Sequence, residues 1–309
     1  MKIGLMLPIG EDDVAGHPPT WSLLRELSES AEEAGLDSIW AADHVLFRDD
    51  DRVVGIHECW TILSAVAAVT SLVEIGPLVL ATPFRNPALT AKMAVALDEV
   101  SNGRLILGLG CGWNGPEFEA FGIDFDHPVG RFEEALSIIL PLLRDGQVDF
   151  EGRWYSASDA VIRPPGPRPG GPPILIAGKR PRMLRLVADH AQLWNAAWYG
   201  PPGTATELTE RVTRLRAACA EEGRDPATLT LTAGVYLAFP HLLTNADEPP
   251  PERAMRGDAE AVGRMLAGYA ELGMEHLIAE VWPHTPEAVA ELGRAAAVTR
   301  QLTGASVSG

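Results

Sequence analysis

The stretch Leu105-Ile106-Leu107-Gly108-Leu109-Gly110-Cys111-Gly112-Trp113 decides the fold of this chain. An apolar run bounded by glycine is typical of a strand that is covered on both faces, as in parallel sheets. Three glycines at alternate positions leave one side of the strand end without Cβ atoms, so that a flat ligand or another stretch of backbone can approach closely. A tight turn from strand to helix is the other interpretation of these residues.

Similar strand candidates recur along the whole chain and alternate with amphipathic helical patterns. The strand candidates span residues 3–9, 38–42, 74–81, 105–109, 174–177, 193–197, 229–238 and 276–281. The helical patterns span residues 23–34, 60–69, 88–100, 132–143, 183–190, 205–222, 259–272 and 286–298. Eight strands, each followed by a helix, predict an α/β fold, a (β/α)8 TIM barrel, and disfavour an open doubly wound sheet. We expect one domain over residues 1–309, because such barrels commonly reach this length.

Two insertions interrupt the alternation, one after strand four and one after strand seven. Residues 146–172 contain a hairpin signal and then a proline-rich run from Pro164 to Pro172, which predicts an extended connector. Residues 240–258 contain Pro249-Pro250-Pro251 and mixed charges, which predict a mobile loop. We expect both insertions to project from an end of the barrel, where they can cover a site.

The composition limits the classes of partner. The formal net charge is −17, which argues against nucleic acid because phosphate binding needs a basic surface. No segment approaches the roughly 18 uninterrupted apolar residues of a membrane span, and the N-terminus has no signal-peptide pattern. The cysteines Cys59, Cys111 and Cys219 lack zinc spacing and suit a reducing compartment. We therefore expect a cytoplasmic protein without membrane partners, and we interpret the acidic runs 11–13 and 49–51 as solvated loops.

In a barrel, the functional residues lie at the C-terminal ends of the strands. The second strand ends in Asp43-His44, and a histidine there can exchange a proton with a ligand near neutral pH. A histidine that closes a loop hydrogen bond beside Asp43 is the alternative. The fifth strand ends in Ala177-Gly178-Lys179-Arg180, directly before a helix. Exposed N–H groups, the helix dipole and two cations predict a phosphate site there, with a solvated basic turn as the alternative.

Other kinds of site receive less support from the sequence. The run from Gly108 to Trp113 lacks the third glycine of the dinucleotide fingerprint and follows the fourth strand, so a nicotinamide Rossmann enzyme is disfavoured. Cys111 has no assignable base, which favours small core packing over a nucleophilic role. The remaining histidines show no metal-binding spacing, and we predict no metal site and no role for His17, His57, His127, His190, His241, His276 and His284.

Six short segments, taken in order, carry a family resemblance. They are Lys2-Ile3-Gly4-Leu5, Ser38-Ile39-Trp40-Ala41-Ala42-Asp43-His44, Pro83-Phe84-Arg85-Asn86-Pro87, the run from Ser101 through Gly110 with Gly112-Trp113, Pro173-Ile174-Leu175-Ile176-Ala177-Gly178 and Leu272-Gly273-Met274-Glu275-His276-Leu277. Through them the chain resembles the bacterial luciferase-like flavin and deazaflavin oxidoreductases over nearly its whole length.

The resemblance implies a TIM barrel, usually a homodimer, that holds FMN or coenzyme F420 in the barrel mouth. Asp43 and His44 match a catalytic pair beside the cofactor ring. A non-proline cis peptide bond is implied in strand three, at Leu78–Val79, behind the ring. The cofactor-binding candidates are Leu78, Val79, Gly110, Cys111, Gly112 and the phosphate loop Ala177, Gly178, Lys179 and Arg180.

The strand end before Trp113 and the helix start Glu58-Cys59-Trp60 look more like the F420-dependent branch than like luciferase proper. Sugar-phosphate dehydrogenases of that branch have a glutamate as proton donor where this chain has Trp113, so the resemblance does not extend to sugar-phosphate oxidation. Trp60 and Trp113 are expected to line a flat, apolar substrate pocket.

The expected activity is hydride transfer between F420 and a small, apolar organic substrate. The alternatives are an FMN-dependent monooxygenase that uses reduced flavin and oxygen, and a barrel that binds a cofactor without turnover.

Overall fold

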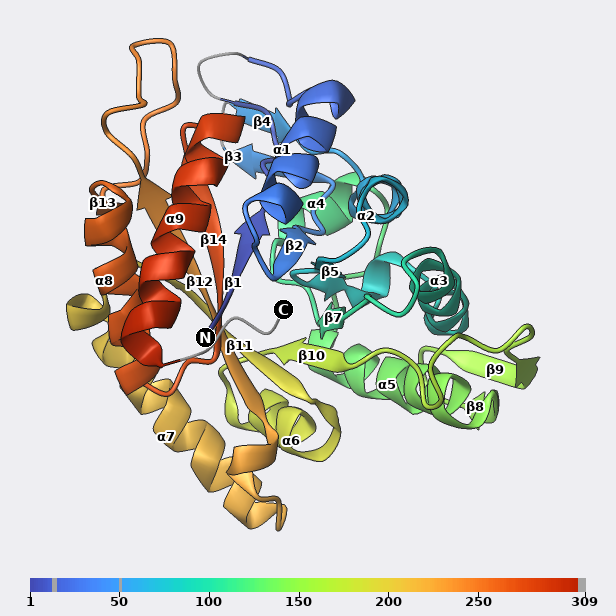
Figure 1. Cartoon of the computed structure of the whole chain (residues 1–309). Helices are drawn as coiled ribbons and strands as arrows, with labels where there is room; N and C mark the ends of the chain where they lie inside the picture. Colours follow the sequence, from blue (N-terminus) through green and yellow to red (C-terminus); the bar gives the residue numbers. More distant parts are fainter. Residues whose placement is uncertain (13–15, 50–51, 305–309) are drawn as a thin grey trace.

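The computed structural model describes residues 1–12, 16–49 and 52–304 (Figure 1). Asp13, Asp50 and Asp51 of the predicted acidic loops lie outside the described residues, as do residues 305–309 at the end of the predicted domain.

A parallel sheet forms the centre of the molecule, and helices cover its outer face (Figure 1). Its strands are β1 (Lys2–Met6), β2 (Ser38–Ala41), β5 (Glu74–Pro77), β6 (Leu80–Ala81), β7 (Leu107–Gly110), β10 (Ile174–Ala177), β11 (Leu193–Tyr199), β12 (Thr230–Ala238) and β14 (His276–Trp282), with the short β13 (Met255–Arg256) paired to β12. The third barrel strand is divided: β5 pairs with β2, and β6 pairs with β7. Because both halves belong to one strand, the described residues close a barrel of eight strand positions. The predicted TIM-barrel class is confirmed.

Each predicted helix overlaps an observed one. The helices are α1 (Trp21–Glu33), α2 (Cys59–Val69), α3 (Pro87–Val100), α4 (Gly115–Ala120), α5 (Pro128–Asp145), α6 (Pro181–His190), α7 (Thr206–Glu221), α8 (Ala259–Glu271) and α9 (Pro286–Thr303). Side-chain caps fix several starts: Thr20 accepts from the Leu23 N–H, Asn86 from Leu89, and Asp258 from Ala261. No helix in the described part of the chain has the length and apolar character to cross a membrane.

Side chains of alternate residues fill the barrel in layers, because successive residues of a strand point to opposite faces. Met6, Trp40, Ile106, Leu175 and Ile278 form an apolar layer inside the barrel. On β1, β2, β10 and β14 the residues two positions further along line the barrel mouth: Pro8, Ala42, Ala177 and Glu280.

The glycines of the fourth strand make room for the third strand. A Cβ on Gly108 would lie 2.0 Å from the Pro77 carbonyl oxygen, and one on Gly110 would lie 2.7 Å from Cγ2 of Val79. The sequence allowed a close approach by either a flat ligand or another stretch of backbone. At Gly108 it is the backbone of the third strand that approaches.

The two predicted insertions lie at different places. Residues 146–172 begin after α5, and the hairpin of β8 (Gln147–Glu151) and β9 (Ser156–Val161) packs along that helix. Among the described residues, none of this segment lines the barrel mouth, so the expectation that it covers a site is wrong. The loop between β12 and α8 does reach the mouth, through Glu248.

A third insertion, a hairpin of β3 (Leu46–Asp49) and β4 (Arg52–Gly55), follows β2. We did not predict it, because its strands are short and the acidic run 49–51 was interpreted as a solvated loop.

Candidate active site

A cavity of about 1060 Å³ opens at the C-terminal ends of the barrel strands. Almost all predicted site residues line it: Asp43, His44, Leu78, Val79, Gly110, Cys111, Gly112, Trp113, Ala177, Gly178, Lys179 and Arg180. Trp60 does not: it lies on α2, is 8% exposed and belongs to the hydrophobic core between the barrel and its helices. The expectation that Trp60 lines the pocket is therefore wrong, because its helix turns the indole away from the barrel mouth.

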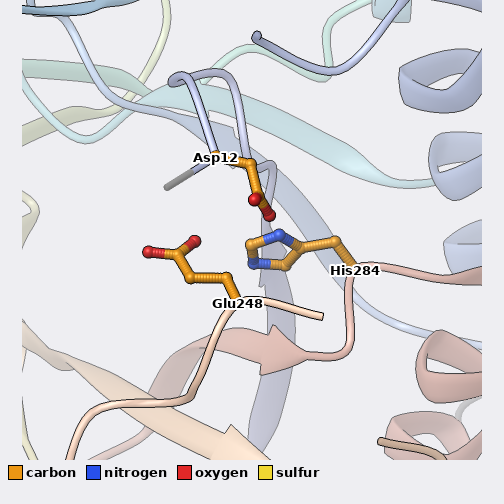
Figure 2. Close-up of side chains that lie close together, drawn as sticks. All are labelled: Asp12, Glu248 and His284. Atoms are coloured by element: carbon orange, nitrogen blue, oxygen red, sulfur yellow. The ribbon is translucent and has the colours of Figure 1, made fainter. Parts of the chain in front are cut away.

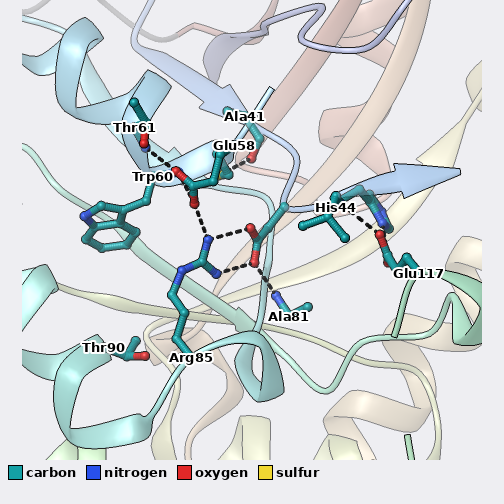
Figure 3. A network of polar contacts seen from close by, with 12 residues as sticks. Ala41, His44, Glu58, Trp60, Thr61, Ala81, Arg85, Thr90 and Glu117 are labelled. Atoms are coloured by element: carbon teal, nitrogen blue, oxygen red, sulfur yellow. Dashed lines mark hydrogen bonds and ion pairs between the residues drawn. The ribbon is translucent and has the colours of Figure 1, made fainter. Parts of the chain in front are cut away.

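His44 forms a pair with Glu117 at the edge of the cavity (Figure 3). Its Nδ1 lies 2.8 Å from Oε1 of Glu117, and the Val45 N–H donates to Oε2 over 3.0 Å. Glu117 is 1% exposed, and α4 carries it there from one turn beyond Trp113. Because a carboxylate accepts only, it holds the proton on Nδ1 and leaves Nε2 as the ring nitrogen for a ligand in the cavity. A positioned imidazole of this kind can give or take a proton.

The carboxylate of Asp43 forms hydrogen bonds within the protein that stabilise the barrel wall. Both of its oxygens accept from Arg85, at 2.8 and 2.9 Å, and Oδ2 also accepts from the Ala81 N–H at 2.9 Å (Figure 3). Arg85 donates in addition to Glu58, which caps the start of α2. Burial raises the pKa of Asp43, and the Arg85 guanidinium opposes that rise. We interpret Asp43 as a positioning residue for the cavity wall, since three hydrogen bonds from Arg85 and Ala81 already engage its two oxygens.

The fifth strand ends at a helix start without a side-chain cap. Arg180 is the N-cap residue of α6, and Pro181 follows it at the first helical position. Within the described residues neither Lys179 nor Arg180 forms a salt bridge, although both are exposed and line the cavity. A Cβ on Gly178 would lie 2.6 Å from Cβ of Met183, so the turn fits only glycine. Uncapped N–H groups and two unpaired cations are the features that bind a phosphate.

The wall on the third strand has the predicted backbone. The peptide bond Leu78–Val79 is cis, which confirms the expectation drawn from the resemblance. Both residues line the cavity between β5 and β6.

Trp113 and Cys111 lie near the His44 side of the cavity. The indole of Trp113 is 69% exposed, and its ring meets the His44 imidazole edge to face at 5.5 Å between centroids. Cys111 is partly buried, and burial raises the pKa of its thiol. A thiol held neutral is a poor nucleophile, which agrees with a packing role.

The opposite side of the cavity holds residues that sequence reasoning missed. Glu280 and Trp282 on β14 line it, with Tyr236 on β12, Glu248 on the following loop, and His284. We predicted no role for His284, but it lines the cavity, so that expectation was incomplete. The alternation of β14 was the signal that could have found Glu280, since it lies two positions beyond the interior residue Ile278.

His276 is placed far from this mouth, at the other end of β14. It is fully buried, pairs with the Ser38 hydroxyl at 2.7 Å, and burial lowers its pKa to about 3. It is a neutral core residue, as the prediction of no functional role requires.

Comparison with known proteins identifies the family. The family model described as luciferase-like monooxygenase matches residues 1–249. This chain belongs to that family. It is therefore an oxidoreductase of the luciferase-like kind, as the resemblance predicted.

Two relatives illustrate the range of luciferase-like proteins to which the chain is similar. A phthiodiolone/phenolphthiodiolone dimycocerosates ketoreductase from Mycobacterium sp. (strain JLS) is 28% identical over 272 residues, which are 82% of this chain and 70% of the relative. A 5,10-methylenetetrahydromethanopterin reductase from Archaeoglobus fulgidus is 33% identical over 159 residues, 52% of this chain and 44% of the relative.

Solved structures of the luciferase-like fold match almost the whole chain. An F420-dependent secondary alcohol dehydrogenase in complex with an F420-acetone adduct superposes with a TM-score of 0.77 at 18% identity, over 97% of this chain and 99% of that one. The monooxygenase RslO1 from Streptomyces bottropensis gives 0.75 at 20% identity, over 97% and 98%. At these identities the match shows the shared fold.

Proposed function

We propose that this luciferase-like protein is a coenzyme F420-dependent oxidoreductase that transfers a hydride to or from a small organic substrate. The observation that carries the proposal is the His44–Glu117 pair at the cavity edge, with Nε2 of His44 left for a ligand. Hydride transfer to a carbonyl must be accompanied by a proton at its oxygen, and a positioned imidazole supplies one. The names of several similar proteins support F420 as the cofactor: the solved alcohol dehydrogenase is F420-dependent, and so is a tetrahydromethanopterin reductase from Methanopyrus kandleri.

The residues of the cavity fit a flat cofactor with a phosphate group. One half of the cavity floor carries very small side chains, of one carbon atom or none. These residues are Ala42, Gly110 and Ala177. Lys179 and Arg180 would hold the phosphate at the start of α6. When bound, the deazaflavin supplies a hydride donor and acceptor; the protein orients the substrate, excludes water and provides His44 for proton transfer. A small-molecule substrate and a homodimer belong to the same proposal.

Fluorescence titration of the purified protein with F420 and with FMN tests the cofactor assignment. We expect F420 to bind at least tenfold more tightly than FMN. The reverse preference would support the flavin-dependent monooxygenase instead. Binding of either cofactor, with no turnover of any ketone or alcohol tried, would support a binding protein without catalysis.

A further inference from the structure

The cavity has opposite charges at its two ends. Lys179 and Arg180 lie at the end of β10, whereas Glu248 and Glu280 lie on the β12–β14 side. Among the described residues, no hydrogen bond or salt bridge engages either of these two carboxylates, and the two cations form no salt bridge. The cations suit the phosphate of the proposed cofactor. The carboxylates have no such explanation, because an anionic cofactor gains nothing from them.

The barrel geometry explains why Glu280 faces the cavity. On β14, His276 and Ile278 point into the barrel, whereas Leu277, Ala279 and Val281 pack outward against the helices. Glu280 continues the inward series, directly above Ile278 and in register with Tyr236 of β12. It is therefore part of the cavity floor.

Three aromatic rings line the same cavity as this carboxylate: Trp198, Tyr236 and Trp282. Trp198 and Tyr236 stack with their centroids 5.0 Å apart, and Tyr236 and Trp282 lie 6.1 Å apart. Nε1 of Trp282 and Nε2 of His284 are buried without a hydrogen-bond partner, and Trp282 is 5% exposed. Buried polar atoms are rarely left unpartnered in proteins. Nε2 of the neutral His284 ring can accept a hydrogen bond from a ligand that donates, whereas the Trp282 indole N–H can only donate.

A second carboxylate and a neutral imidazole extend the site toward the cavity mouth. Atoms of Asp12, Glu248 and His284 that can act as ligands lie within 4.8 Å of one another (Figure 2). Burial lowers the pKa of His284 to about 4, so the ring carries no charge near neutral pH. The Asp12 end of the acidic run that we interpreted as a solvated loop thus belongs to a cluster at the cavity.

Carboxyl groups outnumber guanidinium groups around the site. The groups that act on Glu280 and Glu248 are each other, Asp12, Arg253 and Arg52. Arg253 is partly engaged, since its guanidinium lies over the Tyr236 ring at 4.4 Å and donates to the Tyr236 hydroxyl. Burial, and then the neighbouring Glu248, raise the pKa of Glu280 to about 7. A positive ligand would relieve both effects.

We propose that the β12–β14 end of the cavity binds the ammonium group of an amine-bearing organic molecule, with Glu280 and Glu248 as its counterions and Trp282 as an aromatic wall. Carboxylates and aromatic faces together are the features that recognise organic cations. The binding of the amine does not depend on the proposed function, but its role as the substrate does. The substrate would then have an ammonium group and an apolar or aromatic body. It differs from the expected apolar substrate by adding the ammonium group.

The test compares two probes of the same shape, 2-phenylethylamine and 2-phenylethanol, by isothermal titration calorimetry with the full chain at pH 7. We expect the amine to bind at least tenfold more tightly than the alcohol. Glu280→Gln should remove most of that preference and leave alcohol binding unchanged, whereas Glu119→Gln, an exposed carboxylate of α4, should change neither. Equal affinities for the two probes, or an equal loss of both in Glu280→Gln, would overturn the proposal.

Proton release gives a readout that a merely structural role would not move. If the ammonium lies beside Glu280, its binding favours the ionised form of that carboxyl group, so the protein should release protons when the amine binds near pH 7. The release is measured as the difference in binding heat between phosphate and Tris buffers, and it should be absent in Glu280→Gln. No release from the unmodified protein would contradict Glu280 as the counterion. Glu248→Gln, on the loop, gives a second variant should Glu280→Gln not fold.

Titration with ZnCl₂ or MnCl₂ alone separates an organic cation from a metal ion. We expect neither metal at micromolar concentration to displace the amine. Displacement that disappears in His284→Gln would overturn the proposal in favour of a metal site formed by Asp12, Glu248 and His284. Because all these readouts are binding measurements made without cofactor, their failure is distinguishable from failure to bind F420.

Discussion

At the scale of single residues, His44 depends on a partner that lies far away in sequence. Glu117 reaches it across 73 positions, and its carboxylate also accepts the Val45 N–H. His44, which the resemblance implied, and Glu117, which the structure revealed, thus act together. Glu117 orients the imidazole ring, and His44 faces the cavity.

Replacing His44 with Asn should lower kcat by about 10²–10⁴-fold, the usual contribution of a positioned acid or base. The affinity for the cofactor should change little, because the phosphate loop lies elsewhere. Steady-state kinetics and cofactor titration on the same preparation measure both quantities. A variant that loses cofactor affinity while its kcat is retained would show that His44 holds the cofactor instead.

Glu117→Gln tests orientation separately from chemistry. A glutamine still fills the space but can present a donor to Nδ1, so the ring tautomer is no longer fixed. We expect a lower kcat and an altered pH profile of kcat, with the fold retained by circular dichroism. An unchanged pH profile would mean that Glu117 only packs against the ring.

Glu280 should make the stability of the protein depend on pH. Its pKa is about 7 in the folded protein and near 4.5 when unfolded, so the folded state binds more protons between these values. The free energy of unfolding therefore falls as pH rises through this window, by up to about 3 kcal/mol. Urea unfolding measures the free energy of unfolding at pH 5 and pH 8. Relative to the unmodified protein, Glu280→Gln should be more stable at pH 8 than it is at pH 5. The same stability difference at both pH values would refute this pKa assignment.

At the scale of elements, one arginine joins three parts of the barrel wall. Arg85 follows the third strand, Asp43 follows the second, and Glu58 caps the start of α2. Their contacts hold the ends of neighbouring strands in register below the cavity.

Arg85→Met should destabilise the fold by about 3–5 kcal/mol, because it leaves the buried Asp43 carboxylate without its partner. Arg264→Met breaks an exposed pair with Glu260 on α8 and should cost less than about 1 kcal/mol. Urea unfolding of both variants gives the comparison. Equal losses would show that the Asp43–Arg85 pair is no more than a surface contact.

The sequence predicted the elements well and the contacts between them poorly. Strand and helix positions follow from local periodicity, so each expected strand and each expected helix overlaps an observed one. The division of the third strand at Leu78–Val79 was expected only from the resemblance. Arg85, Glu117 and Glu280 were missed as site residues because their roles arise from partners more than forty residues away or from a strand's inward face. Trp60 shows the reverse error, since its position in sequence gave no information on the direction of its side chain.

At the scale of the whole molecule, the separation of charge within one cavity organises function. The phosphate end should dominate cofactor affinity: Lys179→Ala is expected to weaken F420 binding by about tenfold or more, the loss of one charge-assisted hydrogen bond. Lys92→Ala, on α3 away from the cavity, is the matched control. Fluorescence titration at physiological salt measures both, and an unchanged affinity in Lys179→Ala would move the phosphate away from this loop.

Ligand binding at the acidic end and at the phosphate end should respond differently to ionic strength. The phosphate end should weaken more in high salt, because the exposed charges of Lys179 and Arg180 are screened over about 8–10 Å, whereas the partly buried Glu280 is screened less. The net charge of −17 adds a field that favours cations at the mouth.

The measurement that tests the central claim most directly is anaerobic oxidation of reduced F420 by the protein with a panel of ketones, including amino ketones, followed by the return of the deazaflavin absorbance. The proposed function predicts oxidation without oxygen, fastest with an amino ketone and slowed by His44→Asn. Absence of any ketone-dependent oxidation, together with consumption of oxygen when reduced FMN is supplied, would contradict it.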